Sequence, residues 1–464
     1  MYEDTYFLNG DEALRVASLQ NKTNGGYVLQ VCYYSGEKIE SEYPNLIHLP
    51  IENLVNDLAK GDYRIPAKVD FTGLDISASV KLEILQNFNI SLEQARDYRN
   101  QYNAFYLEAL KNAKLDFSEP LRFYLLAASG TRVMQHISKN IANALQSLGC
   151  EVLFVLDIGI NDLNSLKKMA EFNPHATINI NHINNAILGD DVFNFIWIQD
   201  HFAIEQFKHI RLRKRDFVFN LNIGLGKTLQ SLKIKSTLQQ FCIDTDIYKK
   251  RVEIKKEKKI VFIGSSYKNN FDNIVDSRKY KICDELQKIY LKKGYIGKKE
   301  RSKLLKEYKS NDDDFRDIIN YIERDLSLTY ILKLGLDYKI DVYGYGWEDN
   351  DDVKPYFKGI LSYGEDISKI YNSAEYGLVI GGYVMQQRTL ESAASGTIPL
   401  VFDSRNEDDT DACFDKSILF FKKLDDLKGI LSKRYNFDLN YIASNNSYKN
   451  YIDKILDIIK TYKQ

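Results

Sequence analysis

Residues 375–402 carry the pattern that most constrains how this chain can fold. An apolar run at 375–380 (EYGLVI) predicts a buried strand, a glycine pair follows it, and a helix is expected from about 384 to 394. Gly396 is expected to end that helix in a left-handed conformation, and residues 398–402 (IPLVF) predict the next strand. A strand, a helix and a second strand in this order require a parallel sheet.

The predicted helix carries two opposite charges on one face. Arg388 and Glu391 are three positions apart, so their side chains are neighbours. The glycine turn before the helix, which includes Gly382, offers backbone N–H groups that favour an anion. An arginine pairs well with phosphate, and a carboxylate accepts hydrogen bonds from sugar hydroxyls. The pattern therefore indicates a nucleotide-linked sugar, although Arg388 could instead simply pair with Glu391 or with Glu365.

Length and composition set limits on the class of protein. A chain of 464 residues is too long for one core, so two or three domains are expected. The formal net charge of −1 gives no reason to expect nucleic acid as a partner. Five scattered cysteines form no C-x-x-C pair, which predicts a cytoplasmic protein without disulfides or a metal site. No apolar run approaches the ~20 residues of a membrane span, but peripheral contact at the inner membrane face stays open.

Residues 1–118 contain no catalytic motif that we can identify. Residues 27–34 resemble a strand, residues 51–59 a short helix, and Ser91 with Gln94 forms a capping-box pattern at the start of a longer helix. Two interpretations stay open for this α+β region: an accessory domain or decorated edge of the next domain, and a module that recognises the acceptor.

Residues 119–250 alternate predicted strands with helices, which predicts an open α/β domain. No G-x-G-x-x-G fingerprint is present. The predicted strands lie at 122–127, 151–156, 176–180, 193–198 and 217–220.

Two polar residues follow the strand predicted at 193–198. Ligands of open α/β sheets bind at the carboxyl ends of strands, where Asp200 and His201 are expected. Either residue is predicted as a general base that activates an acceptor hydroxyl, a contribution of ~10²–10⁴-fold to the rate. The alternative is that Asp200 caps a helix.

A charged segment, residues 249–259, leads into the second α/β domain at 251–440. Seven of its residues are basic and two are acidic. Such a run is usually a solvated linker or strand edge, and the alternative is a basic rim around a phosphate cleft. The second domain contains predicted strands at 260–263 and 339–343 and a helical insertion at 270–335, and a helix is predicted within the C-terminal residues 441–464.

Four segments of the second domain resemble the GT-B glycosyltransferases, specifically those with the "group one" C-terminal signature found in bacterial spore-maturation-protein-like enzymes. Residues 240–249 also resemble the family's exit into the interdomain linker, and the whole resemblance covers roughly 240–405 in matching order and spacing. The four segments are 263–266 (IGSS), 342–347 (VYGYGW) with 357–359 (FKG), 363–374 (YGEDISKIYNSA) and 388–396 (RTLESAASG).

The resemblance implies an α/β fold of the GT-B type, with two facing Rossmann-like domains and a nucleotide-sugar donor bound by the second. It implies neither an essential metal nor a cofactor. Carried onto this sequence, it assigns Glu391 to the ribose hydroxyls and Arg388, or the turn at Gly382, to the diphosphate. Gly264 and Ser265 would line the phosphate side.

The resemblance also assigns residues 345–363 to the nucleotide base, which brings Trp347 and Tyr363 to the donor; Trp347 is equally well explained as core. Lys268 is the basic residue near the first glycine turn, where the family carries an Arg/Lys pair. Tyr383 occupies a position that is acidic in the larger retaining group, so the stereochemical outcome stays open.

The predicted function is a metal-independent glycosyltransferase of bacterial surface-glycan or protein glycosylation. It would move a sugar from a nucleoside-diphosphate donor to a hydroxyl on a glycan, a lipid or a protein. One alternative is a non-catalytic GT-B-like partner subunit that binds a polypeptide, against which the intact Arg388 and Glu391 argue. The other is a nucleotide-sugar epimerase, whose dense set of catalytic carboxylates is not evident in the sequence.

Overall fold

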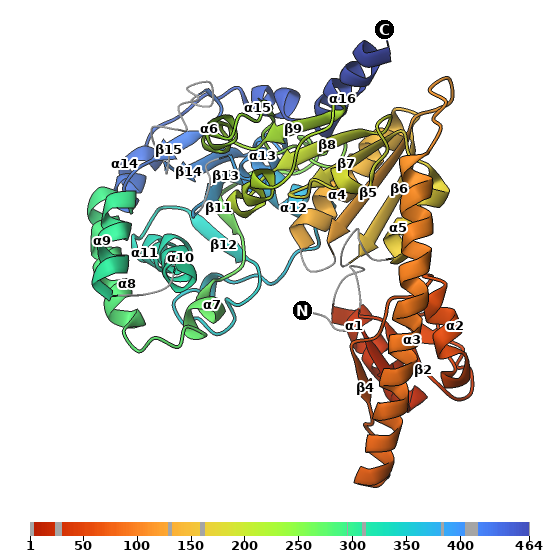
Figure 1. Ribbon diagram of the computed structural model, residues 1–464. Helices are drawn as coiled ribbons and strands as arrows, with labels where there is room; N and C mark the ends of the chain where they lie inside the picture. Colours follow the sequence, from red (N-terminus) through yellow and green to blue (C-terminus); the bar gives the residue numbers. More distant parts are fainter. Residues whose placement is uncertain are drawn as a thin grey trace. The chain divides into compact units, whose positions relative to one another are not determined.

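The chain divides into two compact units, each described here by itself (Figure 1). The first comprises Met1–Leu221, Leu225–Gln239 and Ile452–Gln464, and the second comprises Asn222–Gly224 and Gln240–Tyr451. The charged segment at 249–259 therefore belongs to the second unit. The computed structural model describes residues 4–23, 30–128, 132–157, 163–294, 296–308, 312–381, 385–403 and 416–463.

The second unit is built on a five-stranded sheet in the order β12-β11-β13-β14-β15, with every pair parallel. Helix α13 (Gln387–Ala394) connects β13 to β14, and Gly396 ends it with a φ of +77°. The strand–helix–strand unit predicted at 375–402 is thus confirmed. The strands are β11 (Glu257–Ile263), β12 (Lys339–Tyr343), β13 (Ala374–Val379), β14 (Ile398–Phe402) and β15 (Leu419–Phe421).

The predicted helical insertion is confirmed as a run of helices between β11 and β12. Its buried residues Phe315, Ile318 and Leu328 share one core with Phe262 and Val342 of the sheet. The run contains α7 (Lys268–Asp272), α8 (Lys279–Lys293), α9 (Lys298–Tyr308), α10 (Asp312–Tyr321), the π-helical turn η4 (Ile322–Leu326) and α11 (Ser327–Lys333).

Several further helices complete the second unit, and the last helix of the chain, α16, is divided between the two units. Helix α16 begins in the second unit and ends in the first, to which Ile452–Gln464 belong. These elements are η5 (Lys354–Tyr356), α12 (Glu365–Asn372), η7 (Leu424–Asp426), α14 (Leu427–Leu431), α15 (Leu439–Asn445) and α16 (Tyr448–Lys463).

The first unit contains a six-stranded sheet in the order β10-β9-β8-β7-β5-β6, again parallel throughout. This confirms the predicted open α/β domain, so each unit carries a Rossmann-like parallel sheet. Its elements are β5 (Arg122–Ala128), α4 (Arg132–Ser147), β6 (Glu151–Asp157), α5 (Leu163–Phe172), β7 (Ala176–Ile180), η2 (Asn185–Ile187), β8 (Phe193–Ile198), η3 (His201–Lys208), β9 (Asp216–Asn220), α6 (Ile223–Ser231) and β10 (Ser236–Leu238).

The N-terminal region of this unit has a small parallel sheet of its own, in the order β3-β2-β1-β4. Its strands have three residues each, which is too short for a periodic pattern in the sequence. The elements are β1 (Thr5–Phe7), α1 (Gly10–Thr23), β2 (Cys32–Tyr34), β3 (Leu46–His48), η1 (Ile51–Asn53), α2 (Leu54–Ala59), β4 (Lys68–Asp70) and α3 (Ala78–Lys111).

Helix α3 begins earlier than the sequence suggested, so the predicted start at Ser91 was wrong. Ser77 is the N-cap, and its hydroxyl accepts a hydrogen bond from the N–H of Val80 at 3.3 Å. Ser91 lies inside the helix, where its hydroxyl donates to the carbonyl of Asn87 at 3.0 Å. A serine that bonds back to the preceding turn leaves the helix intact, so its capping pattern was misleading.

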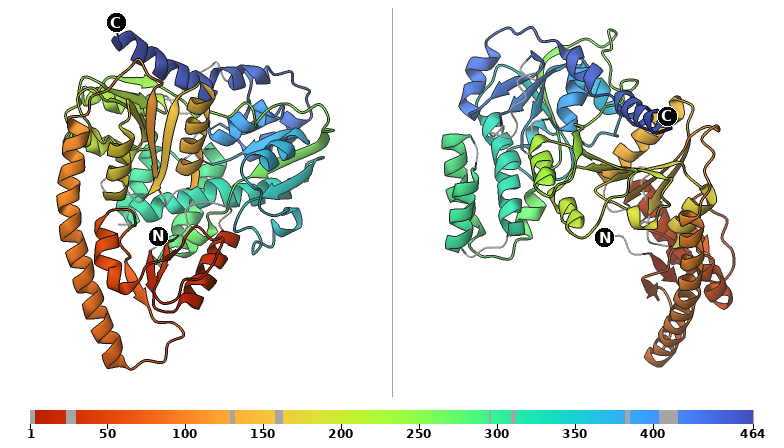
Figure 2. Two further views of the ribbon diagram at one scale, coloured as in Figure 1. Left: turned by 90° about the vertical axis from the view of Figure 1, so that its right-hand side faces the viewer. Right: turned by 45° about the horizontal axis from the view of Figure 1, so that its top comes forward.

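Helix α3 joins the small sheet to the six-stranded sheet (Figure 2). Phe88 and Leu92 pack in the core of the small sheet, whereas Leu110 packs with Leu166 and Met169 of α5. Arg99 occupies the same buried stripe as Phe88, and its Nη1 donates to the carbonyls of Leu58 at 2.9 Å and Tyr63 at 3.0 Å.

Cys32, Cys150, Cys242 and Cys283 form no disulfide bond within the part of the chain that the structure describes, and Cys413 lies outside it. Among the described residues, no helix combines the length and the apolar character needed to cross a membrane.

We expect Arg99→Leu to lower the free energy of unfolding of the N-terminal region by about 1.5–3 kcal/mol, because two buried carbonyls lose a charged donor. Urea unfolding followed by circular dichroism measures the change. The control is Arg96→Leu, at an exposed position of the same helix, which should stay within ~0.5 kcal/mol of wild type. Equal losses in the two variants would contradict a structural role for Arg99.

Candidate functional site

The carboxyl ends of β11 and β13 form the switch point of the sheet in the second unit. Since β12 and β13 flank β11, the connections that leave β11 and β13 diverge there, and open α/β sheets bind ligands at such points. Gly264 and Ser265 directly follow β11, as predicted. Gly382 and Tyr383, which follow β13, lie outside the described residues.

Hydrogen bonds from the end of β12 and from the turn that follows it hold the turn after β11 in place. The N–H of Gly264 donates to the carbonyl of Tyr343 at 2.9 Å, and the carbonyl of Gly264 accepts from Trp347 Nε1 at 2.7 Å. Gly344 has a φ of +139°, and a β-carbon there would overlap the Gly264 carbonyl. Trp347 has no exposed surface, so its ring belongs to the core. It affects the site only through its hydrogen bond to the Gly264 carbonyl.

The π-turn η4 brings two charged residues to the same turn. The carboxylate of Asp325 accepts hydrogen bonds from the hydroxyl of Ser266 and, at 2.9 Å, from the N–H of Tyr267. Burial raises the pKa of Asp325, although both hydrogen bonds act to lower it. Arg324 donates from Nη1 to the carbonyl of Ser265 at 3.2 Å, and its guanidinium lies 4.3 Å from the ring centre of Tyr267.

Arg324 also lies next to the turn that follows β13. A β-carbon placed on Gly381 would be 3.6 Å from Cβ of Arg324 and 3.7 Å from its Nε. That Nε is buried and has no hydrogen-bond partner among the described residues, whereas the residue as a whole is partly exposed. A cation between the two turns of a switch point is placed to meet an anionic ligand.

Sequence analysis missed Arg324. A helical composition does not show which residue of a long insertion faces the sheet. The π-turn that turns Arg324 and Asp325 toward the strand end is set by packing, and such turns are frequent at functional sites.

The predicted pair of Arg388 and Glu391 is present, with Glu391 buried and Arg388 partly exposed. Nη1 of Arg388 forms an ion pair with Oε2 of Glu391, which has no exposed surface. The hydroxyl of Tyr363 donates to Oε1 of Glu391 at 2.9 Å, and Gln387 contacts the same hydroxyl. Glu365 pairs instead with Arg251, at 2.5 Å.

Both oxygens of Glu391 are therefore engaged within the protein. A ribose hydroxyl would compete with Tyr363 or Arg388 for this carboxylate, so the ribose contact stays a prediction. Burial, and next the charge of Glu391, raise the pKa of both Tyr363 and Tyr248. These phenols are consequently protonated near neutral pH, and Tyr363 is a hydrogen-bond donor there.

Lys268 is placed differently from the other predicted donor residues. It begins α7, and its ammonium pairs with Asp272 at 2.5 Å on the surface. The hydrogen bond to Asp272 raises the pKa of Lys268. Exposed pairs of this kind contribute little to stability, so the lysine is available to a ligand at small cost.

In the first unit, Asp200 lies at the carboxyl end of β8, as predicted. Its Oδ2 accepts from Asn181 Nδ2 at 2.7 Å, and Oδ1 of Asn181 accepts from the N–H groups of Gln199 and Asp200 at 2.8 and 3.1 Å. Asp200 occupies the N-cap position of η3, as the alternative interpretation predicted, but its side chain makes no capping hydrogen bond there. His201 is the exposed first residue of η3.

Gln199 is a further candidate that gave no sequence signal. Its side chain is 6% exposed, and neither polar atom of its amide has a hydrogen-bond partner among the described residues. Burying an amide without partners is unfavourable, so such a group needs an explanation. A polar group of a ligand beside Asp200 would supply the missing hydrogen bonds.

Residues 326–438 match a family model described as glycosyl transferase-like. The matched region contains β12, β13, α13 and β14, and hence Trp347, Tyr363, Arg388 and Glu391. It begins directly after Arg324 and Asp325. The match supports glycosyl transfer as the activity of the second unit and does not distinguish the spore-maturation-protein-like group.

Several solved structures resemble the chain weakly, and no curated protein matches it. TarM is 12% identical with a TM-score of 0.34, and the alignment covers 61% of this chain and 54% of TarM. Sucrose-phosphate synthase from Thermosynechococcus elongatus is 10% identical with a TM-score of 0.41, over 74% of this chain and 98% of that one. HepE from Anabaena, in complex with UDP-glucose, is 8% identical with a TM-score of 0.41, over 74% and 100%.

We expect Glu391→Gln to lower the free energy of unfolding of the second unit by about 3–5 kcal/mol, because the mostly covered guanidinium of Arg388 loses its fully buried counter-charge. Urea unfolding measures this loss. The matched control is Glu365→Gln, whose partly exposed pair with Arg251 should contribute at most ~1 kcal/mol.

A double-mutant cycle with Arg388→Met separates a structural role from a ligand role. If the two residues stabilise each other, the double variant loses less stability than the sum of the single variants. Unchanged stability of Glu391→Gln together with weaker nucleotide binding would instead favour direct contact with the ribose.

Proposed function

We propose that the chain is a GT-B glycosyltransferase that moves a sugar, such as a hexose, from a nucleoside-diphosphate donor to a hydroxyl acceptor on a glycan, a lipid or a protein. One observation carries the proposal. The glycosyl transferase-like match at 326–438 includes β13, one of the two strands at the switch point of the second unit, together with α13, which follows it. We also propose, as the sequence predicts, that the enzyme is bacterial and cytoplasmic and that it needs neither a metal nor a cofactor.

In this proposal the second unit binds the donor. The turn at Gly264 and Ser265 and the guanidinium of Arg324 face the diphosphate. Positive charge at that place stabilises the negative charge that develops on the departing diphosphate. Arg388 and Glu391, on α13, form a wall of the site together with Tyr363.

In the same proposal, the first unit binds the acceptor. Asp200 acts as the general base that removes the proton of the attacking hydroxyl, and His201 is the alternative base. Asn181 orients the Asp200 carboxylate through the 2.7 Å hydrogen bond. The buried amide of Gln199 binds a polar group of the acceptor.

The function is tested by a thermal-shift screen with UDP, GDP, ADP and CMP, since a ligand of the folded state raises the unfolding temperature. We expect one nucleotide to stabilise the protein. The corresponding nucleotide sugar should be consumed faster with an acceptor than without one, and EDTA should leave the rate unchanged. Conversion of the donor into an isomer without any acceptor would indicate an epimerase. No binding of any nucleotide would favour the non-catalytic partner subunit.

We expect Arg324→Gln to weaken binding of the nucleoside diphosphate by roughly 10- to 100-fold, the range that corresponds to a hydrogen bond with a charged group. Isothermal titration calorimetry measures the affinity. Arg316→Gln, at an exposed position of the preceding helix α10, is the control and should bind like wild type. Equal affinity of both variants would remove Arg324 from the phosphate site while leaving the proposed activity untouched.

A further inference from the structure

The amino ends of the strands in the second unit border a groove, on the edge of the sheet opposite to the candidate donor site. We call it the amino-end groove. It consists of two adjoining cavities of about 730 and 380 Å³, which share Lys258, Tyr338, Leu431 and Ser432. The larger one has the size of a site for a small molecule.

The larger cavity concentrates positive charge. Four basic residues, Lys256, Lys258, Lys433 and Arg434, line it together with one carboxylate, Glu375. Within the described part of the chain, the side chains of Lys433 and Arg434 form no ion pair. The chain as a whole has a net charge of −1, so this excess is local. Cations that gather in a recess favour an anionic ligand.

Two of these cations are held in place by the protein. Nζ of Lys256 donates to the carbonyl of Ala374 at 3.3 Å and to that of Gly396. Lys258 pairs with Asp337 at 2.5 Å. Burial of its ammonium group, and next the charge of Lys250, lower the pKa of Lys256 to about 8. An anion in the groove would offset both the burial of the Lys256 ammonium and its repulsion from Lys250.

The strand geometry explains why these lysines gather. Lys256 directly precedes β11 and Lys258 is its second residue, and both line the larger cavity. Lys259 points the other way and is buried against Asp341 at 3.5 Å. The basic run at 249–259 is thus more than a solvated linker, because two of its lysines line the recess.

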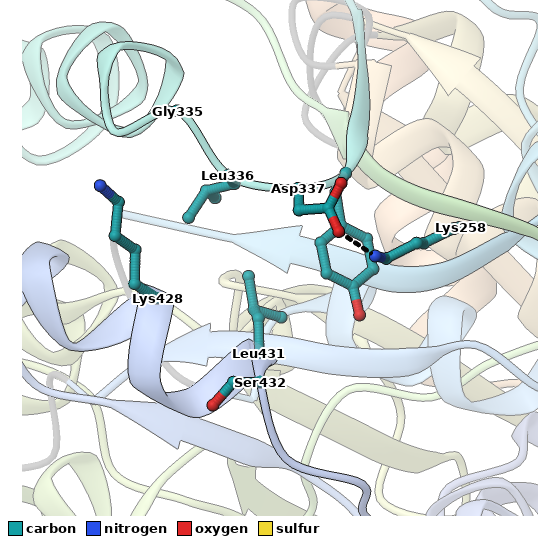
Figure 3. A pocket seen from close by; sticks show the side chains of 8 residues that line it. Lys258, Gly335, Leu336, Asp337, Lys428, Leu431 and Ser432 are labelled. Carbon is teal, nitrogen blue, oxygen red and sulfur yellow. Dashed lines mark hydrogen bonds and ion pairs between the residues drawn. The ribbon is translucent and has the colours of Figure 1, made fainter.

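Apolar and aromatic groups form the rest of the lining. The ammonium of Lys258 lies 5.1 Å from the ring centre of Tyr338, which packs edge-on against Tyr376 at 5.6 Å. Tyr435 and Phe437 stack with ring centres 5.7 Å apart. In the smaller cavity, Lys258 and Lys428 lie on opposite sides and the side chains of Leu336 and Leu431 lie between them (Figure 3).

We infer that the amino-end groove is a second binding site, for a phosphate-bearing molecule with a ring or another apolar portion. Arginine and lysine side chains bind the phosphate, and the aromatic residues receive the apolar portion. The inference does not depend on the proposed function, because the groove and the donor turns lie at opposite ends of the same strands. A soluble phosphate ester and a phospholipid headgroup share this chemistry.

The test uses the full chain and the double variant Lys433→Gln/Arg434→Gln, which removes two exposed charges that form no ion pairs. Lys303→Gln/Lys306→Gln, at exposed positions of α9, is the charge-matched control. Calorimetry with phenyl phosphate and with inorganic pyrophosphate probes soluble ligands. Co-sedimentation with phosphatidylcholine vesicles, with and without phosphatidic acid, probes headgroups.

We expect the groove variant to lose affinity for phenyl phosphate, or for vesicles with phosphatidic acid, by on the order of 10-fold or more, while the control binds like wild type. Loss of phenyl phosphate binding identifies a soluble ligand, and loss restricted to vesicles with phosphatidic acid identifies a headgroup. Tighter binding of phenyl phosphate than of pyrophosphate supports the aromatic contact. The inference is overturned if wild type binds neither probe class, or if the groove variant and the control lose affinity equally.

Discussion

The parallel pairing of β11 with β13 is the constraint on which the candidate donor site depends. Val261 lies opposite Gly377, and Phe262 lies opposite Leu378, so the two strands end side by side. A β-carbon on Gly377 would be 2.8 Å from Cβ of Ser392, which shows how closely α13 packs on β13. That close approach fixes α13, and with it Arg388 and Glu391, against the sheet.

Much of this architecture could be predicted from the sequence, because long buried strands leave apolar runs. The strands β7, β8, β12 and β14 have the predicted bounds. In the N-terminal sheet, β2 lies within the strand predicted at 27–34, whereas β1, β3 and β4 were not predicted, because three residues are too few for a periodic pattern. The start of α3 was misplaced because a serine inside a helix can imitate a cap.

The site was only partly predictable, for a related reason. The spacing of Arg388 and Glu391 shows that the two side chains meet, but complete burial of the carboxylate depends on Tyr363 and on the approach of α13 to the sheet. Arg324 and Gln199 belong to no motif, and each becomes a candidate only through the turn or strand end that the fold places beside it. Such residues can be recognised from their tertiary contacts but not from a local sequence pattern.

The helices between β11 and β12 have a consequence for how this protein could be divided or recombined. They are the crossover connection of a βαβ unit, and their side chains complete the core around Phe262 and Val342. The π-turn at their end carries Asp325, which fixes the turn after β11. The insertion is therefore not a separable module. An exchange of residues 270–335 between relatives would replace about half of a core together with one wall of the candidate donor site, so natural variation in this segment has to occur in concert with the strands it covers.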